Sequence, residues 1–164
     1  TALRHAIAVD DAALVVELAA AGVRFEGPLQ GSALATDMAV SRSAYAAAAA
    51  LVRAGAPVSA EVLANIDGQI APELTTALLA NGAEPNMTAV VACVACGAPA
   101  SARLIAEACA RNGIDVPAAF IVDRDALLAE LEGTLIQVRS GSMGHYLGPE
   151  GLAERIEHLQ SFRL

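Results

Sequence analysis

The chain has 164 residues, of which 55% are apolar and only 3% aromatic, and its formal net charge is −8. This length fits a single domain over residues 1–164 with a core of its own, and abundant alanine favours many closely packed helices. The acidic balance argues against nucleic-acid binding, which needs clustered Lys or Arg, and it suits a basic protein partner.

The first part of the chain predicts two helix pairs, each closed by a glycine. A helix that begins at Thr1 is broken at Asp10-Asp11, which supply an N-cap for a helix over about residues 12–21. Gly22 then follows the last apolar residue, where a helix ends most easily with a positive φ. The second pair is predicted at residues 37–40 and 44–53, and Gly55 ends it.

Two further pairs follow with the same closing signal. The third contains Leu63 and a helix that begins near Pro72, where a missing N–H costs nothing, and it ends at Gly82. The fourth is predicted at residues 88–96 and about 100–111, and Gly113 ends it. Four copies of one helix-stop signal indicate a repeat protein.

These copies resemble ankyrin repeats. Gly22 and Gly55 are 33 residues apart, which is the ankyrin period, and the next two steps are 27 and 31 residues. The segment Gly82-Ala-Glu-Pro-Asn86 is similar to the repeat ending of that family. In the first copy, the residues at the family spacings are Thr1, Leu3, Ala6, Leu14, Val15, Leu18 and Gly22.

The resemblance implies an all-α fold, namely an αα-hairpin solenoid of about four ankyrin-like repeats with a C-terminal helical cap. The repeats fall at about residues 1–32, 33–59, 60–86 and 87–116, and the cap covers residues 117–164. Only the first link, residues 23–32, is long enough for the β-hairpin finger that such repeats carry.

The cap is predicted in short pieces. Residues 117–122 and 125–131 have helical patterns, and residues 135–138 either extend the second helix or form a strand. A turn over residues 140–144 precedes an amphipathic helix that starts at Pro149. The apolar stripe of that helix consists of Leu152, Ile156, Leu159 and Phe162.

Three cysteines are the main candidates for chemistry. Cys93 and Cys96 form a CxxC, and Cys109 lies in the partner helix. The pair sits among Ala and Val in a predicted helix, which favours buried core, while a disulfide to Cys109 or a metal site are the alternatives. Because the three histidines have no spacing to a nucleophile, we expect no catalytic site, no cofactor and no metal.

The resemblance implies a partner-binding surface on the concave side of the repeats. Its expected residues are His5, Val9, Met38, Arg42, Asn65 and Gln69, with Arg24, Phe25 and Glu26 on the finger. Phe25 is either an exposed interface anchor or a buried contact with the second repeat.

The expected function is therefore protein–protein recognition without catalysis, within which a bacterial regulator, inhibitor or immunity-type protein is favoured. Two alternatives stay open: an adaptor fragment of a larger chain, and a small enzyme or metal protein that uses the cysteines or the turn over residues 134–148. We expect a cytoplasmic monomer. The longest charge-free segment, residues 85–102, is too weakly apolar to span a membrane, and the N-terminus shows no signal peptide.

Overall fold

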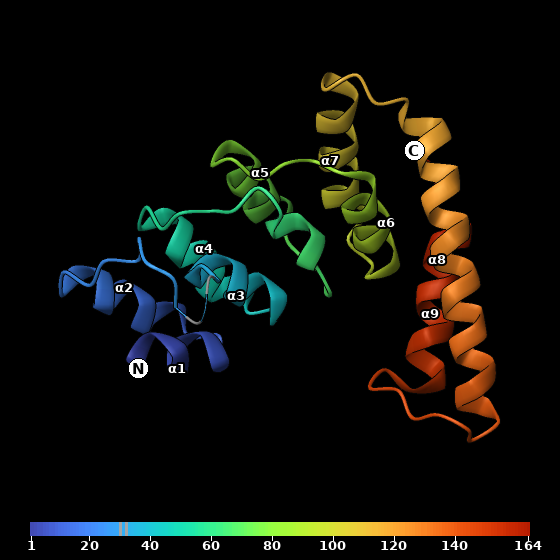
Figure 1. The fold of residues 1–164 in the computed structure, drawn as a ribbon, viewed down its shortest axis with the longest axis horizontal. Helices are drawn as coiled ribbons and strands as arrows, with labels where there is room; N and C mark the ends of the chain where they lie inside the picture. The colour runs from blue at the N-terminus through green and yellow to red at the C-terminus, as the bar shows by residue number, and fades with distance from the viewer. Residues whose placement is uncertain (30, 32) are drawn as a thin grey trace. The chain divides into compact units, whose positions relative to one another are not determined.

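The computed structural model describes residues 1–29, 31 and 33–164, and all regular elements of these residues are helical (Figure 1). The prediction of an all-α fold is therefore confirmed. The elements are α1 (Ala2–Ala8), α2 (Ala12–Ala20), α3 (Ala35–Ser41), α4 (Tyr45–Arg53), the 3₁₀ helix η1 (Val62–Asn65), α5 (Pro72–Ala80), α6 (Met87–Ala95), α7 (Pro99–Arg111), α8 (Val116–Arg139) and α9 (Gly148–Ser161).

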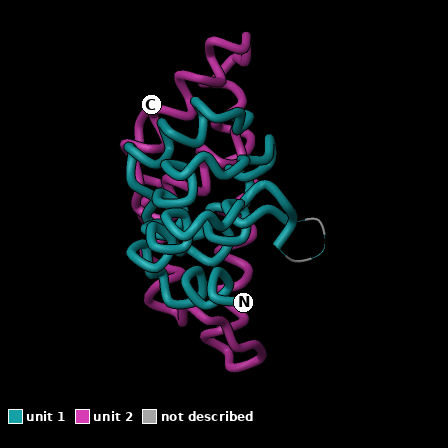
Figure 2. The backbone as a smooth tube through the Cα atoms, turned by 90° about the vertical axis from the view of Figure 1, so that its left-hand side faces the viewer, with its two compact units in different colours: residues 1–85 teal, residues 86–164 magenta. Residues whose placement is uncertain are grey.

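The chain divides into two compact units, Thr1–Pro85 and Asn86–Leu164, which Figure 2 draws in different colours. The length of the chain alone predicts a single domain over the same residues. Each unit has buried apolar residues of its own and is described by itself.

The four glycines predicted as helix stops all have the expected backbone conformation. Their φ angles are 81° at Gly22, 78° at Gly55, 103° at Gly82 and 82° at Gly113. At each one, the glycine N–H donates to a carbonyl three residues earlier, and the next N–H donates to a carbonyl five residues earlier. These bonds satisfy the last carbonyls of the helix, so the predicted stop signal is confirmed at each position.

The first unit consists of helices that contact their counterparts in the next pair. α1 contacts α2 and α3, and α3 contacts α4 and η1. On the other side, α2 contacts α4, and α4 contacts α5. Burial of apolar side chains between these helices stabilises the unit. The largest of those that are fully buried are Ile7, Val15, Val40, Leu51, Val62, Leu63 and Leu78.

The second unit is built around α6, which contacts α7, α8 and α9. Seven of its residues are buried: Met87, Ala89, Val90, Val91, Cys93, Val94 and Ala95. The rings of Phe120 on α8 and Phe162 after α9 lie 5.6 Å apart, and the guanidinium of Arg103 lies 4.8 Å from the centre of the Phe162 ring. These contacts fix the ends of α8 and α9 against α7.

Helix α8 differs from its prediction, because one helix of 24 residues replaces the predicted pieces. Residues 135–138 are helical and extend it, so the strand alternative is wrong. The Asp123-Arg124-Asp125 segment does not interrupt the helix, and Arg124 donates to Asp125 Oδ1 at 2.8 Å on its surface. The predicted amphipathic helix is α9, in which Leu152 and Leu159 are buried.

Candidate functional site

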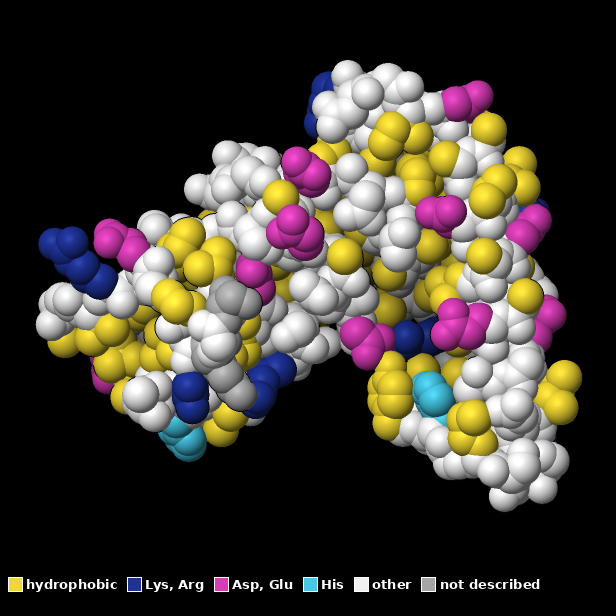
Figure 3. Space-filling model, in the orientation of Figure 1, with side chains coloured by type: hydrophobic (Ala, Val, Ile, Leu, Met, Phe, Trp, Pro, Cys, Tyr) yellow, Lys and Arg dark blue, Asp and Glu magenta, His cyan; other side chains and the backbone are white. Residues whose placement is uncertain are grey.

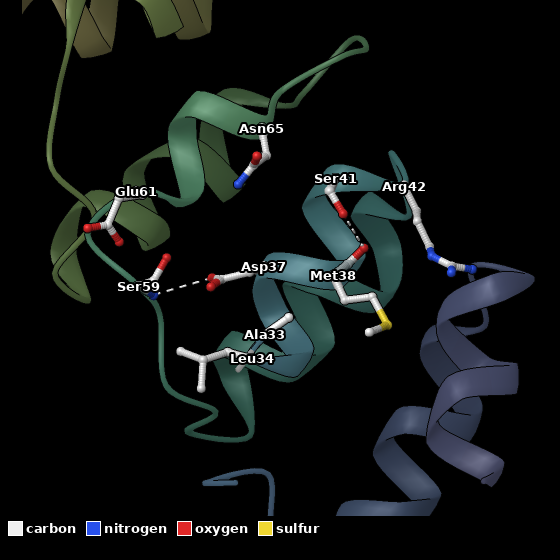
Figure 4. A pocket seen from close by; sticks show the side chains of 9 residues that line it. All are labelled: Ala33, Leu34, Asp37, Met38, Ser41, Arg42, Ser59, Glu61 and Asn65. Carbon is white, nitrogen blue, oxygen red and sulfur yellow. Dashed lines mark hydrogen bonds between the residues drawn. The ribbon is translucent and has the colours of Figure 1, made fainter. Parts of the chain in front are cut away.

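A groove of about 730 Å³ runs along α3 in the first unit (Figure 4). One wall is α3 with the residues at its ends, and the other is the segment from Ser59 to Asn65. Its volume lies in the range of sites that bind ligands or peptide side chains. The lining residues are Ala33, Leu34, Asp37, Met38, Ser41, Arg42, Ser59, Glu61 and Asn65.

Helical spacing explains the α3 wall. Leu34, Asp37, Met38, Ser41 and Arg42 follow one another at steps of three, one, three and one residues, so they share one face of the helix. The opposite face of the same helix holds the buried residues Thr36, Ala39 and Val40. Burial of that face holds α3 in place, and its groove face stays open.

A hydrogen bond connects the two walls. The backbone N–H of Ser59 donates to Oδ1 of Asp37 at 3.3 Å (Figure 4). On α3 itself, the Ser41 hydroxyl donates to the Met38 carbonyl at 3.0 Å. The Asp37 bond fixes the position of Ser59 relative to α3, so the width of the groove is set within the unit.

Three polar side chains of the groove make no polar contact with the residues that the structure describes. Among the described residues, the side chains of Arg42, Glu61 and Asn65 form no hydrogen bond and no ion pair. Other arginines of the unit are engaged: Arg4 donates to the Leu29 carbonyl at 2.7 Å and Arg53 to the Ala49 carbonyl at 3.1 Å. The groove therefore offers a guanidinium, a carboxylate and an amide to a partner.

The structure brings three of the predicted partner-binding residues together. Met38, Arg42 and Asn65 all line the groove, although Asn65 is 23 residues from Arg42 in the sequence. His5 is exposed on α1, and Gln69 is exposed in the loop after η1; neither lines this groove.

The predicted finger requires a correction. Arg24 and Glu26 are exposed, with 83% and 74% of their side-chain surface accessible, and they pair with each other at 3.9 Å. Phe25 between them is only 5% exposed, so it is not available to a partner. Burial of a large aromatic side chain lowers the free energy of the folded chain, and an exposed loop position would forgo this stabilisation. The burial of Phe25 therefore favours the buried-contact alternative. Residues 30 and 32 of the finger lie outside the described residues.

Much of the groove consists of residues that the sequence did not point to. Asp37, Ser41, Ser59 and Glu61 line it but were not among the predicted site residues. The spacing from Leu34 to Arg42 could have identified the α3 residues as one face. The contribution of Ser59 and Glu61 depends on the path of the chain after α4, for which the sequence carries no local signal.

The cysteines belong to the core of the second unit. Cys93, Cys96 and Cys109 are free thiols and are buried. Burial, with a smaller effect from Cys96, raises the pKa of Cys93 to about 12, and burial also raises the pKa of Cys109. Such thiols are poor nucleophiles. In the described part of the chain, no three His, Cys, Asp or Glu side chains are grouped so that they could hold a metal ion.

Comparison with known proteins gives no family assignment: no family model, curated protein or solved structure matches the chain. Within residues 1–29, 31 and 33–164, no helix has the length and apolar character needed to traverse a lipid bilayer.

Proposed function

We propose that this chain is a non-catalytic protein-recognition module that binds a partner along the α3 groove and the neighbouring exposed face of α1. The observation that carries the proposal is that the polar groups of Arg42, Glu61 and Asn65 line one groove without a bond to any described residue. Groups that are already positioned lose little entropy on binding, so such a surface suits recognition of another protein.

We also propose that the helix pairs are divergent ankyrin-like repeats. Three features support this: the 33-residue step between Gly22 and Gly55, the shared glycine turn, and, within the first unit, the contacts of helices with their counterparts in the next pair. Stacked repeats of this kind present a rigid surface whose specificity depends on individual side chains.

The charge of the chain supports a basic partner. Between Arg53 and Arg103 there is no Lys, Arg or His, and this stretch contains Glu61, Asp67, Glu73 and Glu84. Figure 3 shows acidic side chains at the surface of each unit taken by itself. A surface of this sign attracts a basic protein and speeds its association. A regulator or inhibitor of the immunity type, which occupies a basic target protein, fits this chemistry.

Affinity capture with two matched variants tests the proposal. Asn65→Arg adds a positive charge within the groove, and Ala54→Arg adds the same charge at an exposed position after α4, outside the groove. We expect a partner captured by the natural chain to be retained by Ala54→Arg and lost by Asn65→Arg. Retention by both variants, or loss by both, would argue against this binding surface.

A further inference from the structure

We propose that the α3 groove accepts an extended peptide segment of the partner, with an acidic group at Arg42 and a basic side chain at Asp37 and Glu61. This inference rests on the proposed function, since it specifies the chemistry of the segment that the same groove would bind. It assigns a direction to the bound chain as well as a charge pattern.

The charges of the groove are separated along α3. Arg42 lies at the C-terminal end of the helix, and Asp37 lies in its first turn. Glu61 comes from the other wall, on the side where Ser59 donates to Asp37, and Arg42 points away from both (Figure 4). A segment with opposite charges at two positions fits this arrangement in one direction only.

The charged groups are available to such a segment. Asp37 uses Oδ1 for Ser59, and its second carboxylate oxygen has no hydrogen bond to any described residue. Arg42 is a planar donor that pairs well with a carboxylate, and its guanidinium makes no bond within the described part of the chain. A polyanion would meet repulsion at Asp37 and Glu61, which excludes a nucleic acid as the occupant.

The length of α3 sets the spacing of the charges. Five residues separate Asp37 from Arg42, which corresponds to about 7.5 Å along a helix. An extended peptide advances about 3.3 Å per residue, so its two charged residues should be about two positions apart. The separation can rise to about four positions where the peptide's charged side chains are long enough to bend toward each other. Met38 supplies apolar contact between the charged ends, and Leu34 extends the apolar lining beyond Asp37 at the start of α3. The Asn65 amide has both donors and an acceptor, as recognition of a peptide backbone requires.

The test is a selection from a displayed library of random peptides, carried out in parallel on three forms of the full chain. The first form is the natural chain. The second carries Arg42→Glu together with Glu61→Arg, which exchanges the charges at these two positions and conserves the net charge, while Asp37 keeps its charge and its bond to Ser59. The third carries Arg53→Glu together with Glu73→Arg, a matched exchange on α4 and α5 outside the groove. Circular dichroism checks that all three forms fold alike.

We expect the natural chain and the control to enrich peptides that carry an acidic and a basic residue at this spacing. The exchanged form should not enrich these peptides and should bind them about tenfold or more weakly. Enriched peptides without such a charge pair, or no enrichment, would overturn the inference. If peptides or a captured partner respond to Asn65→Arg but not to the charge exchange, the inference fails while the proposed function stands.

Discussion

The carboxylate of Asp10 accepts a hydrogen bond from the backbone N–H of Ala47 at 2.8 Å, across 37 residues of sequence. Ala47 lies in the first turn of α4, whose own N-cap residue, Ala44, has no side-chain oxygen. Asp10, in the turn between α1 and α2, therefore caps a helix of the next pair. Ser43 occupies the equivalent turn between α3 and α4 and donates its hydroxyl to the Asp67 carbonyl at 3.0 Å.

Both turn residues adopt a backbone conformation that favours glycine. The φ angle is 53° at Asp10 and 56° at Ser43. In each turn, the N–H of this residue donates to a carbonyl three residues earlier, and the N–H of the next residue donates to a carbonyl five residues earlier. These are the same two bonds that occur at the helix-ending glycines. The strain is offset by the bond that each side chain makes to the following helix pair, so these turns link one pair to the next.

Replacement of Asp10 should separate the effect of its hydrogen bond to Ala47 from the effect of its unfavourable φ angle. Asp10→Ala loses the bond to Ala47 and keeps the unfavourable φ, so we expect the free energy of unfolding to fall by about 1–3 kcal/mol. Asp10→Gly loses the bond but removes the backbone strain, so it should lower the free energy of unfolding by less than Asp10→Ala does. Asp10→Asn keeps an acceptor and should be nearly neutral. Urea unfolding followed by circular dichroism checks this order, and an alanine variant as stable as the natural chain would disprove the capping role.

Gly68 should resist substitution because of a close approach. A Cβ atom there would lie 3.0 Å from Ser43 Oγ and 3.1 Å from the Tyr45 hydroxyl. We expect Gly68→Ala to lower the free energy of unfolding by about 1–3 kcal/mol through overpacking. Gly27→Ala is the control, since no atom of a described residue other than its chain neighbours lies within 4 Å of its added Cβ, and it should change stability by less than about 0.5 kcal/mol. Equal effects in thermal unfolding would contradict this contact.

Two fully buried threonines allow a matched test of hydrogen bonding. Thr36 and Thr75 are both 0% exposed, and the Thr75 hydroxyl donates to the Ala71 carbonyl at 3.1 Å. The Thr36 hydroxyl has no hydrogen-bond partner among the described residues. Thr36→Val removes a buried polar group that makes no bond, so we expect stability to rise by about 1 kcal/mol. Thr75→Val removes a satisfied hydroxyl and should bring no such gain. A loss of stability in the Thr36 variant would show that its hydroxyl is bonded.

The cysteine pKa values predict how stability depends on alkaline pH. Cys93 has a pKa raised from 9.0 to about 12 in the folded chain, so the unfolded chain loses this proton first as the pH rises. The contribution of the protonated Cys93 thiol to the free energy of unfolding is fully present below pH 9.0 and is lost between pH 9.0 and about 12. The slope should approach about 1.4 kcal/mol per pH unit for this thiol, and Cys93→Ala should reduce it. Urea unfolding over this pH range measures the slope, and identical slopes in the two chains would exclude the effect.

The sequence predicted the local features of the fold well because those features have local causes. Gly22 and Gly113 end helices through their own backbone freedom, and Asp11 caps α2 by accepting from Leu14 N at 3.0 Å. Contacts that join distant segments were less accessible. No local pattern shows that Asp10 reaches Ala47, or that Phe25 is buried.

The groove was predicted only in part. Met38, Arg42 and Asn65 were all predicted from the resemblance to ankyrin repeats, and the structure places all three in the groove. Glu61 and Ser59 enter the groove only because the chain after α4 passes alongside α3 and bonds to Asp37. After residue 116 the sequence predicted short helical pieces, whereas α8 is one continuous helix. Its contacts with α6 and α9 stabilise it through the positions at which the local pattern predicted an end.

Photo-crosslinking at two exposed positions tests most directly whether a partner binds along α3. A photoreactive residue replaces Asn65 in the groove in one form of the chain and Ala54, outside the groove, in the other. With a captured partner present, the binding surface proposed above predicts a covalent adduct at position 65 and none at position 54. Adducts at position 54 alone, or equally at both positions, would contradict recognition through the α3 groove.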